Sequence, residues 1–156
     1  MVKILFICHG NICRSPMAEF IMKDMVKKAG REGDFLIASA ATSAEEIWKG
    51  VGNPVYPPAR EELKKHGISC EEKRAVQLKK SDYNKYDYLI GMDDANIKNM
   101  KRITGRQDKI YKLLSFAGSD ASVADPWYSG EFGIAYSDIE RGVKGFFEYL
   151  KELENA

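Results

Sequence analysis

The sequence predicts an α/β fold: a single three-layer domain over residues 1–156, with a four-stranded parallel sheet and helices on both faces. Short apolar runs alternate along the chain with segments of helical periodicity, and this alternation is typical of parallel sheets covered by helices. The chain has the length of one ordinary domain and shows no internal repeat or low-complexity tract. Ligands in such folds bind at the carboxyl ends of the strands.

Four strands are expected where short runs are rich in apolar and aromatic residues. The first run is continuously apolar from residue 4 to residue 7, which is typical of a strand buried on both faces. In chain order, we expect the strands at residues 2–7, 35–38, 86–90 and 110–114. The first strand therefore ends immediately before Cys8.

Helices are expected between and after these strands. The first begins at Ser15-Pro16, with Ser15 as the N-cap and Pro16 at the first helical position, and it ends near Gly30. Further helices are expected at residues 59–66, from about residue 94, and along the C-terminal segment 139–153. Two long connections remain, at 41–58 and 115–133, and loops of this length are often functional.

The composition excludes several classes of partner. The 24 basic and 23 acidic residues leave a formal net charge of +1, which gives no case for nucleic-acid or membrane binding by the whole molecule. The apolar stretch at residues 4–7 is too short for a targeting signal or a membrane span. The three cysteines are an odd number and fit a reducing cytosol better than secretion, so a cytoplasmic location is expected.

The strongest motif lies between the first strand and the first helix and has the form Cys, five residues, Arg, Ser. A loop that curls into a helix start can point successive backbone N–H groups at one centre, which suits a phosphate dianion. Gly10 and Asn11 tolerate the left-handed backbone angles that such a curl requires. The predicted phosphate-binding loop consists of His9, Gly10, Asn11, Ile12, Cys13, Arg14 and Ser15.

Three side chains of this motif suit phosphoryl chemistry. The field of the loop favours the thiolate form of Cys8, which is the nucleophilic form of a cysteine. Arg14 offers a planar fork for two phosphate oxygens, and the Ser15 hydroxyl can stabilise the sulfur. The alternative is structural: a buried Cys8 at a strand end and an exposed Arg14 near a helix cap.

Asp125 is the candidate general acid. A thiolate that attacks phosphorus needs a proton donor for the leaving oxygen, and Asp125-Pro126 lies in the last long loop, at the expected catalytic edge of the sheet. The alternative is a turn-forming Asp-Pro pair. We expect Trp127, Tyr128 and Trp48 to form aromatic walls for a flat phenyl group, unless they cap the core instead.

Taken together, these residues closely resemble the low-molecular-weight protein tyrosine phosphatases, in the form found in bacterial members. The matching segments are residues 8–16, 39–43, 66–68, 92–93 and 125–126. The resemblance implies a twisted four-stranded parallel sheet and hydrolysis of phosphotyrosine without a cofactor. It assigns Cys8 as the nucleophile, Arg14 as the phosphate clamp and Asp125 as the general acid.

Further roles are implied by the resemblance alone. Asn11 would hold the shape of the loop, supported from a second layer by Ser39 and His66. Cys13 would form a reversible disulfide with Cys8 under oxidant and so protect Cys8 from over-oxidation.

Neither histidine of the chain lies in a metal-binding cluster of the sequence, so no metal is expected.

The sequence departs from the family pattern at two places. Trp127 stands where many relatives carry Tyr, and residues 48–51 look inserted, so the family's specificity tryptophan does not map safely onto Trp48.

Two alternatives to the phosphatase function remain open. One is a thiol-dependent arsenate reductase, with Cys70 as the remaining cysteine, and the other is a non-catalytic phosphate-binding module. The expected substrate is a phosphotyrosine-containing protein or a small aryl phosphate, and the expected state is a monomer, with a weak dimer as the alternative.

Overall fold

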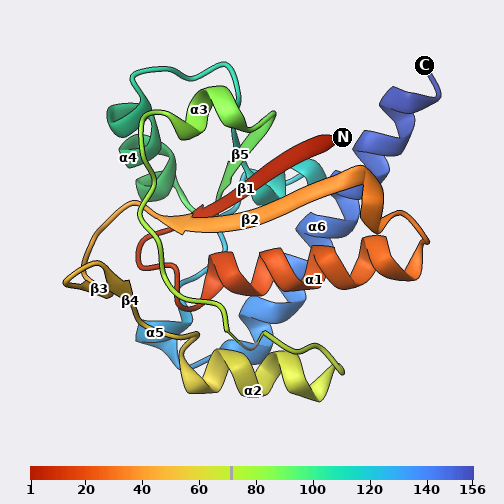
Figure 1. Ribbon diagram of the computed structural model, residues 1–156. Coiled ribbons are helices and arrows are strands. Elements are labelled where there is room, and N and C mark those ends of the chain that lie inside the picture. The colour runs from red at the N-terminus through yellow and green to blue at the C-terminus, as the bar shows by residue number, and fades with distance from the viewer. Residues whose placement is uncertain (71) are drawn as a thin grey trace.

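A parallel four-stranded sheet forms the centre of the molecule (Figure 1). The computed structural model describes residues 1–70 and 72–156. The strand order is β2-β1-β5-β6, and every neighbouring pair runs parallel, which confirms the predicted sheet. The strands are β1 (Val2–Cys8), β2 (Phe35–Ala41), β5 (Tyr88–Gly91) and β6 (Ile110–Lys112).

The continuous apolar run of β1 follows from its place inside the sheet. Ile4 and Phe6 belong to the hydrophobic cluster on one face, whereas Leu5 and Ile7 belong to the cluster on the other. Because both faces of β1 are covered, every residue from Ile4 onward is buried. The strand ends at Cys8, which therefore lies at the carboxyl edge of an inner strand.

Helices cover both faces of the sheet and complete the three layers. Helices α1 and α6 pack on one face with α2 outside them, and α3 and α4 cover the other face (Figure 1). The helices are α1 (Arg14–Lys28), α2 (Pro57–Lys65), α3 (Asp82–Lys85), α4 (Asp94–Thr104), α5 (Pro126–Ser129) and α6 (Phe132–Glu154). Along residues 1–70 and 72–156, no helix is both long enough and apolar enough to span a membrane.

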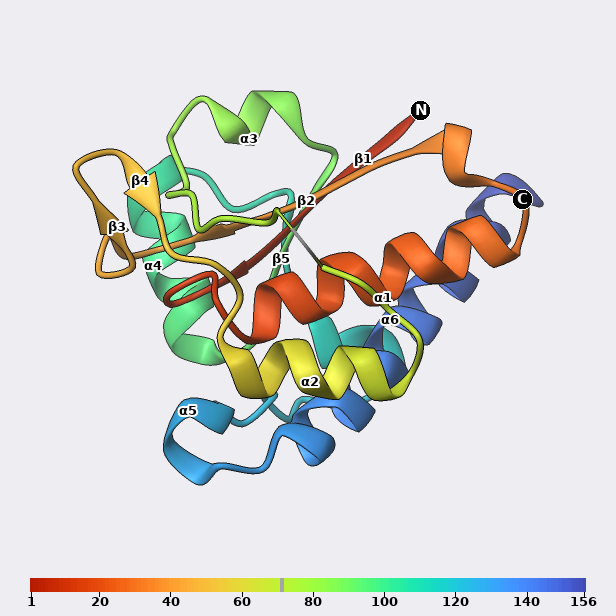
Figure 2. The same ribbon diagram turned by 60° about the horizontal axis from the view of Figure 1, so that its bottom comes forward.

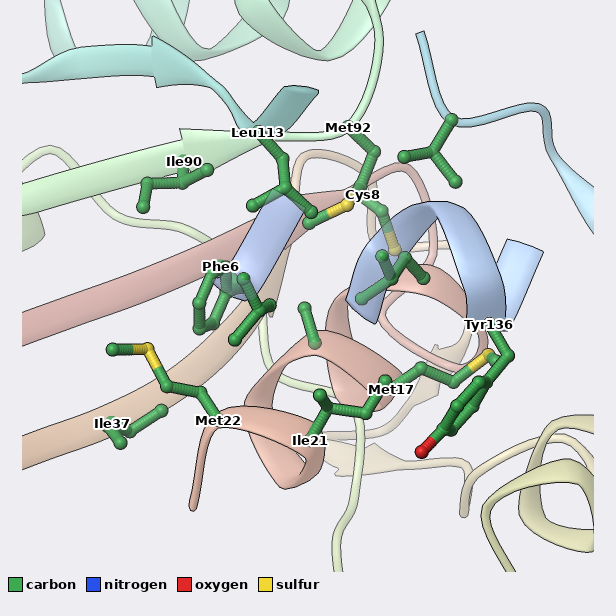
Figure 3. Close-up of a cluster of buried hydrophobic side chains, with 14 of the residues drawn as sticks. Phe6, Cys8, Met17, Ile21, Met22, Ile37, Ile90, Met92, Leu113 and Tyr136 are labelled. Atoms are coloured by element: carbon green, nitrogen blue, oxygen red, sulfur yellow. The ribbon is translucent and has the colours of Figure 1, made fainter. Parts of the chain in front are cut away.

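The larger hydrophobic cluster lies between the sheet and helices α1 and α6 (Figure 3). Phe6, Met22 and Leu113 are fully buried in it. Cys8 belongs to the same cluster, with 3% of its surface exposed. The nucleophile candidate is therefore held on a rigid, well-packed strand end.

Several elements differ in extent from the sequence prediction. The predicted strand at 110–114 stops at Lys112, and the 3₁₀ helix η2 (Leu113–Ala117) follows, because Leu113 and Leu114 turn inward against α6. Helix α6 begins at Phe132, seven residues before the predicted segment. A second 3₁₀ helix, η1 (Glu32–Asp34), precedes β2.

The long connection at 41–58 contains a short antiparallel hairpin of β3 (Ile47–Trp48) and β4 (Val51–Gly52). Its turn residues, Lys49 and Gly50, have φ values of 49° and 79°, as expected of a two-residue turn that needs left-handed backbone. Figure 2 shows this hairpin, α5 and the loop between β1 and α1 on the same side of the molecule. Both predicted long loops therefore reach the carboxyl end of β1.

Candidate active site

The loop between β1 and α1 curls around the sulfur of Cys8. The Asn11 backbone N–H donates to Cys8 Sγ at 3.3 Å, and Asn11 has a φ of 59°. Gly10, which was also expected to adopt a left-handed angle, is not among the glycines with positive φ. Asn11 alone therefore supplies the reversal that the predicted loop required.

Ser15 contacts the nucleophile candidate directly and does not cap the helix. Its Oγ lies 3.0 Å from Cys8 Sγ, and both side chains are buried. Helix α1 begins two residues earlier than predicted, at Arg14, with Cys13 as the N-cap residue and no side-chain cap. The prediction of Ser15 as N-cap was wrong, because its hydroxyl is engaged by the sulfur and by the Asn11 side chain.

Arg14 is buried and is held by three acceptors. Its Nη1 donates to Asp93 Oδ2 at 2.7 Å and to the Val123 carbonyl oxygen at 2.9 Å, and its Nη2 donates to Asp125 Oδ2 at 3.4 Å. Burial lowers the pKa of Arg14, but the charges of Cys8, Asp93 and Asp125 outweigh burial and raise that pKa above its ordinary value. Arg14 therefore stays cationic beside the sulfur.

Asp125 reaches this site from the far end of the chain. It is the N-cap of α5, where its Oδ1 accepts the Trp127 backbone N–H at 3.1 Å. Pro126 occupies the first helical position, so the short helix fixes the backbone of the aspartate. The second carboxylate oxygen is left to face Arg14, with about a quarter of the side chain exposed (26%).

A cavity of about 130 Å³ brings these residues together. Cys8, Arg14 and Asp125 line it, together with residues of the loop between β1 and α1. Trp127 and Tyr128 form part of its wall, and the Trp127 ring packs on Tyr56 with ring centroids 4.6 Å apart. The cavity therefore combines an anion-binding end with an aromatic side.

Trp48 is placed elsewhere. It lies on the β3–β4 hairpin with 75% of its surface exposed, and it is not among the described residues that line the cavity. The structure thus brings two of the three predicted aromatic walls to the site.

Two acidic residues that the sequence did not single out also line the cavity. Glu45 Oε2 lies 3.0 Å from His9 Nε2, and Glu46 Oε2 accepts the Asn53 side-chain amide at 3.2 Å. The only signal in the sequence was a pair of adjacent carboxylates in a long loop. They place negative charge in the lining of a pocket that also contains the cationic Arg14.

The Asn11 side chain is held by Ser39, as predicted, but not by His66. Asn11 Nδ2 donates to Ser39 Oγ at 2.9 Å and to Ser15 Oγ at 2.8 Å. His66 instead stacks on Tyr136, with ring centroids 3.8 Å apart, and bonds to Glu62 at the end of α2. In the part of the chain that the structure describes, His66 makes no hydrogen bond to Asn11, so its predicted supporting role needs correction.

Cys13 lines the same cavity as Cys8 but is chemically different. Burial, with added effects of Cys8 and Asp125, raises the pKa of the Cys13 thiol well above its ordinary value.

Cys70 is buried and lines a different cavity, beside Ile68. Over residues 1–70 and 72–156, no group of three or more His, Cys, Asp or Glu side chains is arranged to hold a metal ion.

Comparison with known proteins gives a consistent result. A family model described as "Low molecular weight phosphotyrosine protein phosphatase" matches residues 3–156. A low molecular weight protein-tyrosine-phosphatase of Bacillus subtilis, YfkJ, is 40% identical over 136 residues, which cover 85% of this chain and 85% of the relative. A phosphatase of Schizosaccharomyces pombe with the family's name is 40% identical over 145 residues, or 88% of this chain and 90% of its own.

The solved structures agree with the sequences. The crystal structure of Bacillus subtilis YfkJ matches with a TM-score of 0.90 at 35% identity, and the match covers 97% of this chain and 96% of that one. The parallel sheet, the loop around Cys8 and the family match thus lead to one assignment. The chain belongs to the low molecular weight phosphotyrosine protein phosphatase family.

Proposed function

We propose that this protein hydrolyses phosphotyrosine through a covalent phosphocysteine on Cys8, with Asp125 as general acid and base. The observation that carries the proposal is the meeting of Cys8, Arg14 and Asp125 in one cavity, although they come from opposite ends of the sequence. Binding of phosphate alone would require neither a thiol nor a carboxyl group. The family match and the aromatic wall support an aryl phosphate as the substrate.

In the first step, the Cys8 thiolate attacks phosphorus in line with the leaving oxygen. The sulfur–phosphorus bond forms while the bond between phosphorus and the tyrosine oxygen breaks, and Asp125 donates its proton to that oxygen. Arg14 and backbone N–H groups of the loop, of which that of Asn11 donates to Cys8 Sγ, would stabilise the charge on the equatorial oxygens. Tyrosine leaves and Asp125 is left as a carboxylate.

In the second step, water hydrolyses the phosphocysteine. Asp125 takes a proton from the water as its oxygen bonds to phosphorus, and the sulfur–phosphorus bond breaks. The hydroxyl of Ser15, 3.0 Å from Cys8 Sγ, stabilises the sulfur as it regains its negative charge. Inorganic phosphate leaves, and the thiolate and the protonated Asp125 are restored.

The aromatic wall would favour phosphotyrosine over phosphoserine or phosphothreonine. Trp127 and Tyr128 lie in the same cavity as Cys8 and offer flat faces to a phenyl ring. A short aliphatic phosphate would reach Cys8 without contacting these rings. Replacement of Trp127 by Ala is therefore expected to raise the KM for an aryl phosphate more than for an alkyl phosphate.

Turnover of para-nitrophenyl phosphate by matched variants tests the mechanism. Cys8→Ser is expected to abolish turnover, and acid-quenched wild type is expected to carry a phosphoryl group on Cys8 by mass spectrometry. Asp125→Asn keeps a good helix cap but is expected to lower kcat by about a hundredfold or more for poor leaving groups. Asp120→Asn, an exposed change in the same loop, serves as the control and should retain wild-type kcat. Full activity of Cys8→Ser would refute the scheme.

The same assays separate the rival functions. Arsenate reduction on this fold would pass a disulfide from Cys8 to further cysteines, and Cys70 lines a different cavity from Cys8. We expect steady hydrolysis of para-nitrophenyl phosphate that is inhibited by orthovanadate and insensitive to chelators. Thioredoxin-coupled arsenate reduction without phosphatase turnover would favour the reductase, and phosphate binding without either activity would favour a regulatory module.

Oxidation is expected to inactivate the enzyme reversibly. Peroxide would oxidise the Cys8 thiolate to a sulfenic acid, and the Cys13 sulfur would then displace hydroxide to form a disulfide, with release of water. Both cysteines line one cavity, which supports this pairing. Such chemistry suits a reducing compartment such as the cytosol, where the disulfide would be reduced again. Peroxide-treated Cys13→Ser enzyme should regain less activity with dithiothreitol than wild type.

A further inference from the structure

A buried carboxylate, Glu19, and a half-buried lysine, Lys73, have no part in the proposed chemistry. Glu19 on α1 is 4% exposed, and its Oε1 lies 3.6 Å from Lys73 Nζ. The Lys73 Nζ also donates to the Ser39 carbonyl oxygen at 3.0 Å. Burial lowers the pKa of Lys73, while the attraction of Glu19 opposes that effect. Burying the carboxylate of such an ion pair is costly, so its connection to the site is informative.

An unbroken chain of buried hydrogen bonds links Glu19 to the nucleophile. Ser39 Oγ donates to Glu19 Oε1 at 2.5 Å. Asn11 Nδ2 donates to both Ser39 Oγ and Ser15 Oγ, at 2.9 and 2.8 Å. Ser15 Oγ then lies 3.0 Å from Cys8 Sγ. Each of these five residues is at most 4% exposed, so water does not compete for the bonds.

Glu19 and the Val76 backbone N–H fix the direction of the hydrogen bonds that lie between them. A carboxylate only accepts, so the single hydroxyl proton of Ser39 is committed to Glu19. At the other side of the amide, the Val76 backbone N–H donates to Asn11 Oδ1 at 3.1 Å. A flipped Asn11 amide would place two donors against each other at Val76 and two acceptors at Ser39. It would also attract the Ser15 proton away from the sulfur.

We propose that Glu19, held in place by Lys73, is a positioning residue that directs the Ser15 hydroxyl proton onto the sulfur of Cys8. The alternative acceptor for that proton is the Ala40 carbonyl oxygen at 3.4 Å, which is farther away and uncharged. A hydroxyl proton aimed at the sulfur would stabilise negative charge there when the phosphocysteine breaks down. The inference rests on the proposed role of Cys8 as nucleophile.

The charged and titratable groups around the chain come from several elements. Lys23 on α1 donates to Glu19 Oε2 at 2.6 Å, and Lys73 approaches from the segment after α2. The Cys8 end is faced by Arg14 with its two carboxylates and by Cys13. Among these groups, only Glu19 accepts the hydroxyl proton of Ser39. Glu19 is therefore the acceptor to remove in the test.

The test measures the thiolate of Cys8 without turnover. The rate of Cys8 alkylation by iodoacetamide is followed against pH in wild type and in Glu19→Leu. Loss of a hydrogen bond to a charged group is expected to move the midpoint of the profile upward by about one pH unit, which is about a tenfold loss of thiolate below the midpoint. Glu19→Gln keeps an acceptor for Ser39 and should restore most of this shift.

Glu62→Leu is the matched control. Glu62 is also a buried carboxylate on a helix, paired with Lys65 and His66, but it lies outside the chain. It should lower Tm by an amount similar to Glu19→Leu while leaving the midpoint unchanged. An unmoved midpoint in Glu19→Leu, or an equal shift in Glu62→Leu, overturns the proposal.

A second variant protects the test against misfolding. Ser39→Ala breaks the same chain without burying an unpaired charge, and it should raise the midpoint in the same direction. An unchanged midpoint in Ser39→Ala also overturns the proposal. Because alkylation needs no turnover, a wild type that fails to hydrolyse para-nitrophenyl phosphate would refute the proposed function separately.

Discussion

Replacement of Gly52, on strand β4, by Ala should disturb the active site through a clash with the backbone of Ala75. An added Cβ at Gly52 would lie 1.9 Å from the Ala75 carbonyl oxygen and 2.7 Å from the Ala75 nitrogen. Since ordinary contact begins near 3.4 Å, the two backbones must separate by roughly 1.5 Å. Gly52 is not among the residues with positive φ, so the effect comes from this contact and not from backbone strain.

The segment that must move also holds the loop around the sulfur. Ala75 N–H donates to the Asn53 carbonyl oxygen at 2.9 Å, and the next residue, Val76, donates to Asn11 Oδ1 at 3.1 Å. Overpacking of this kind typically costs about 1–3 kcal/mol, which lowers Tm by roughly 3–10 °C in a chain of this size. Loss of the bond to Asn11 should lower kcat/KM by about three- to tenfold.

Gly50→Ala is the control for Gly52→Ala. Gly50 lies in the turn of the same hairpin, has a φ of 79° and would meet nothing within 4 Å. It should cost about 1–2 kcal/mol through left-handed strain, lowering Tm while leaving kcat/KM within twofold of wild type. Thermal unfolding and the kinetics of para-nitrophenyl phosphate hydrolysis are measured for both variants and for wild type. The reasoning is refuted if Gly52→Ala retains wild-type Tm and kcat/KM, or if Gly50→Ala loses as much activity.

Three further predictions concern the core, the rim and the second cysteine of the loop. Gly145→Ala should destabilise the protein by about 1–3 kcal/mol in urea unfolding, because the new Cβ would lie 2.2 Å from the Phe116 carbonyl oxygen; an unchanged midpoint would contradict this contact. Glu46→Lys at the cavity rim should lower KM by about two- to fivefold for acidic phosphotyrosine peptides and raise it for basic ones, with equal changes for both peptides counting against a charge effect. In Cys8→Ser, Cys13 should resist iodoacetamide at neutral pH and react only in strong alkali, since burial raises its pKa and keeps the thiol protonated; rapid labelling seen by mass spectrometry would disagree.

The fold and the main chemical residues were predictable because their signals are local. A buried parallel strand needs a continuous apolar run, and β1 provides one that ends at Cys8. Asp125-Pro126 is predictable because the chemistry needs a proton donor and because its long loop follows the last strand, at the carboxyl edge of the sheet. These features require only short stretches of sequence and the topology of the sheet.

The remaining site depends on which side chains meet across the fold, which the local pattern does not encode. Ser15 looked like a helix cap, but its hydroxyl is taken by groups that reach it through the curl of the loop. His66 was selected as the partner of Asn11 by sequence resemblance, whereas a backbone N–H of Val76 takes that role. The sequence analysis did not single out Glu19 or Lys73, and only the structure shows that Glu19 is buried and that Lys73 lies against it.

The contacts of Arg14 explain how substrate binding can prepare the general acid. Its Nη1 is occupied by Asp93 at 2.7 Å and by a carbonyl oxygen, so this side of the guanidinium positions the side chain. Its Nη2 holds Asp125 by a weaker contact of 3.4 Å. A phosphate dianion above Cys8 would compete for Nη2 and displace the aspartate. Released from Arg14, the Asp125 carboxyl group would be free to turn toward the leaving tyrosine oxygen, as its proposed role as general acid requires.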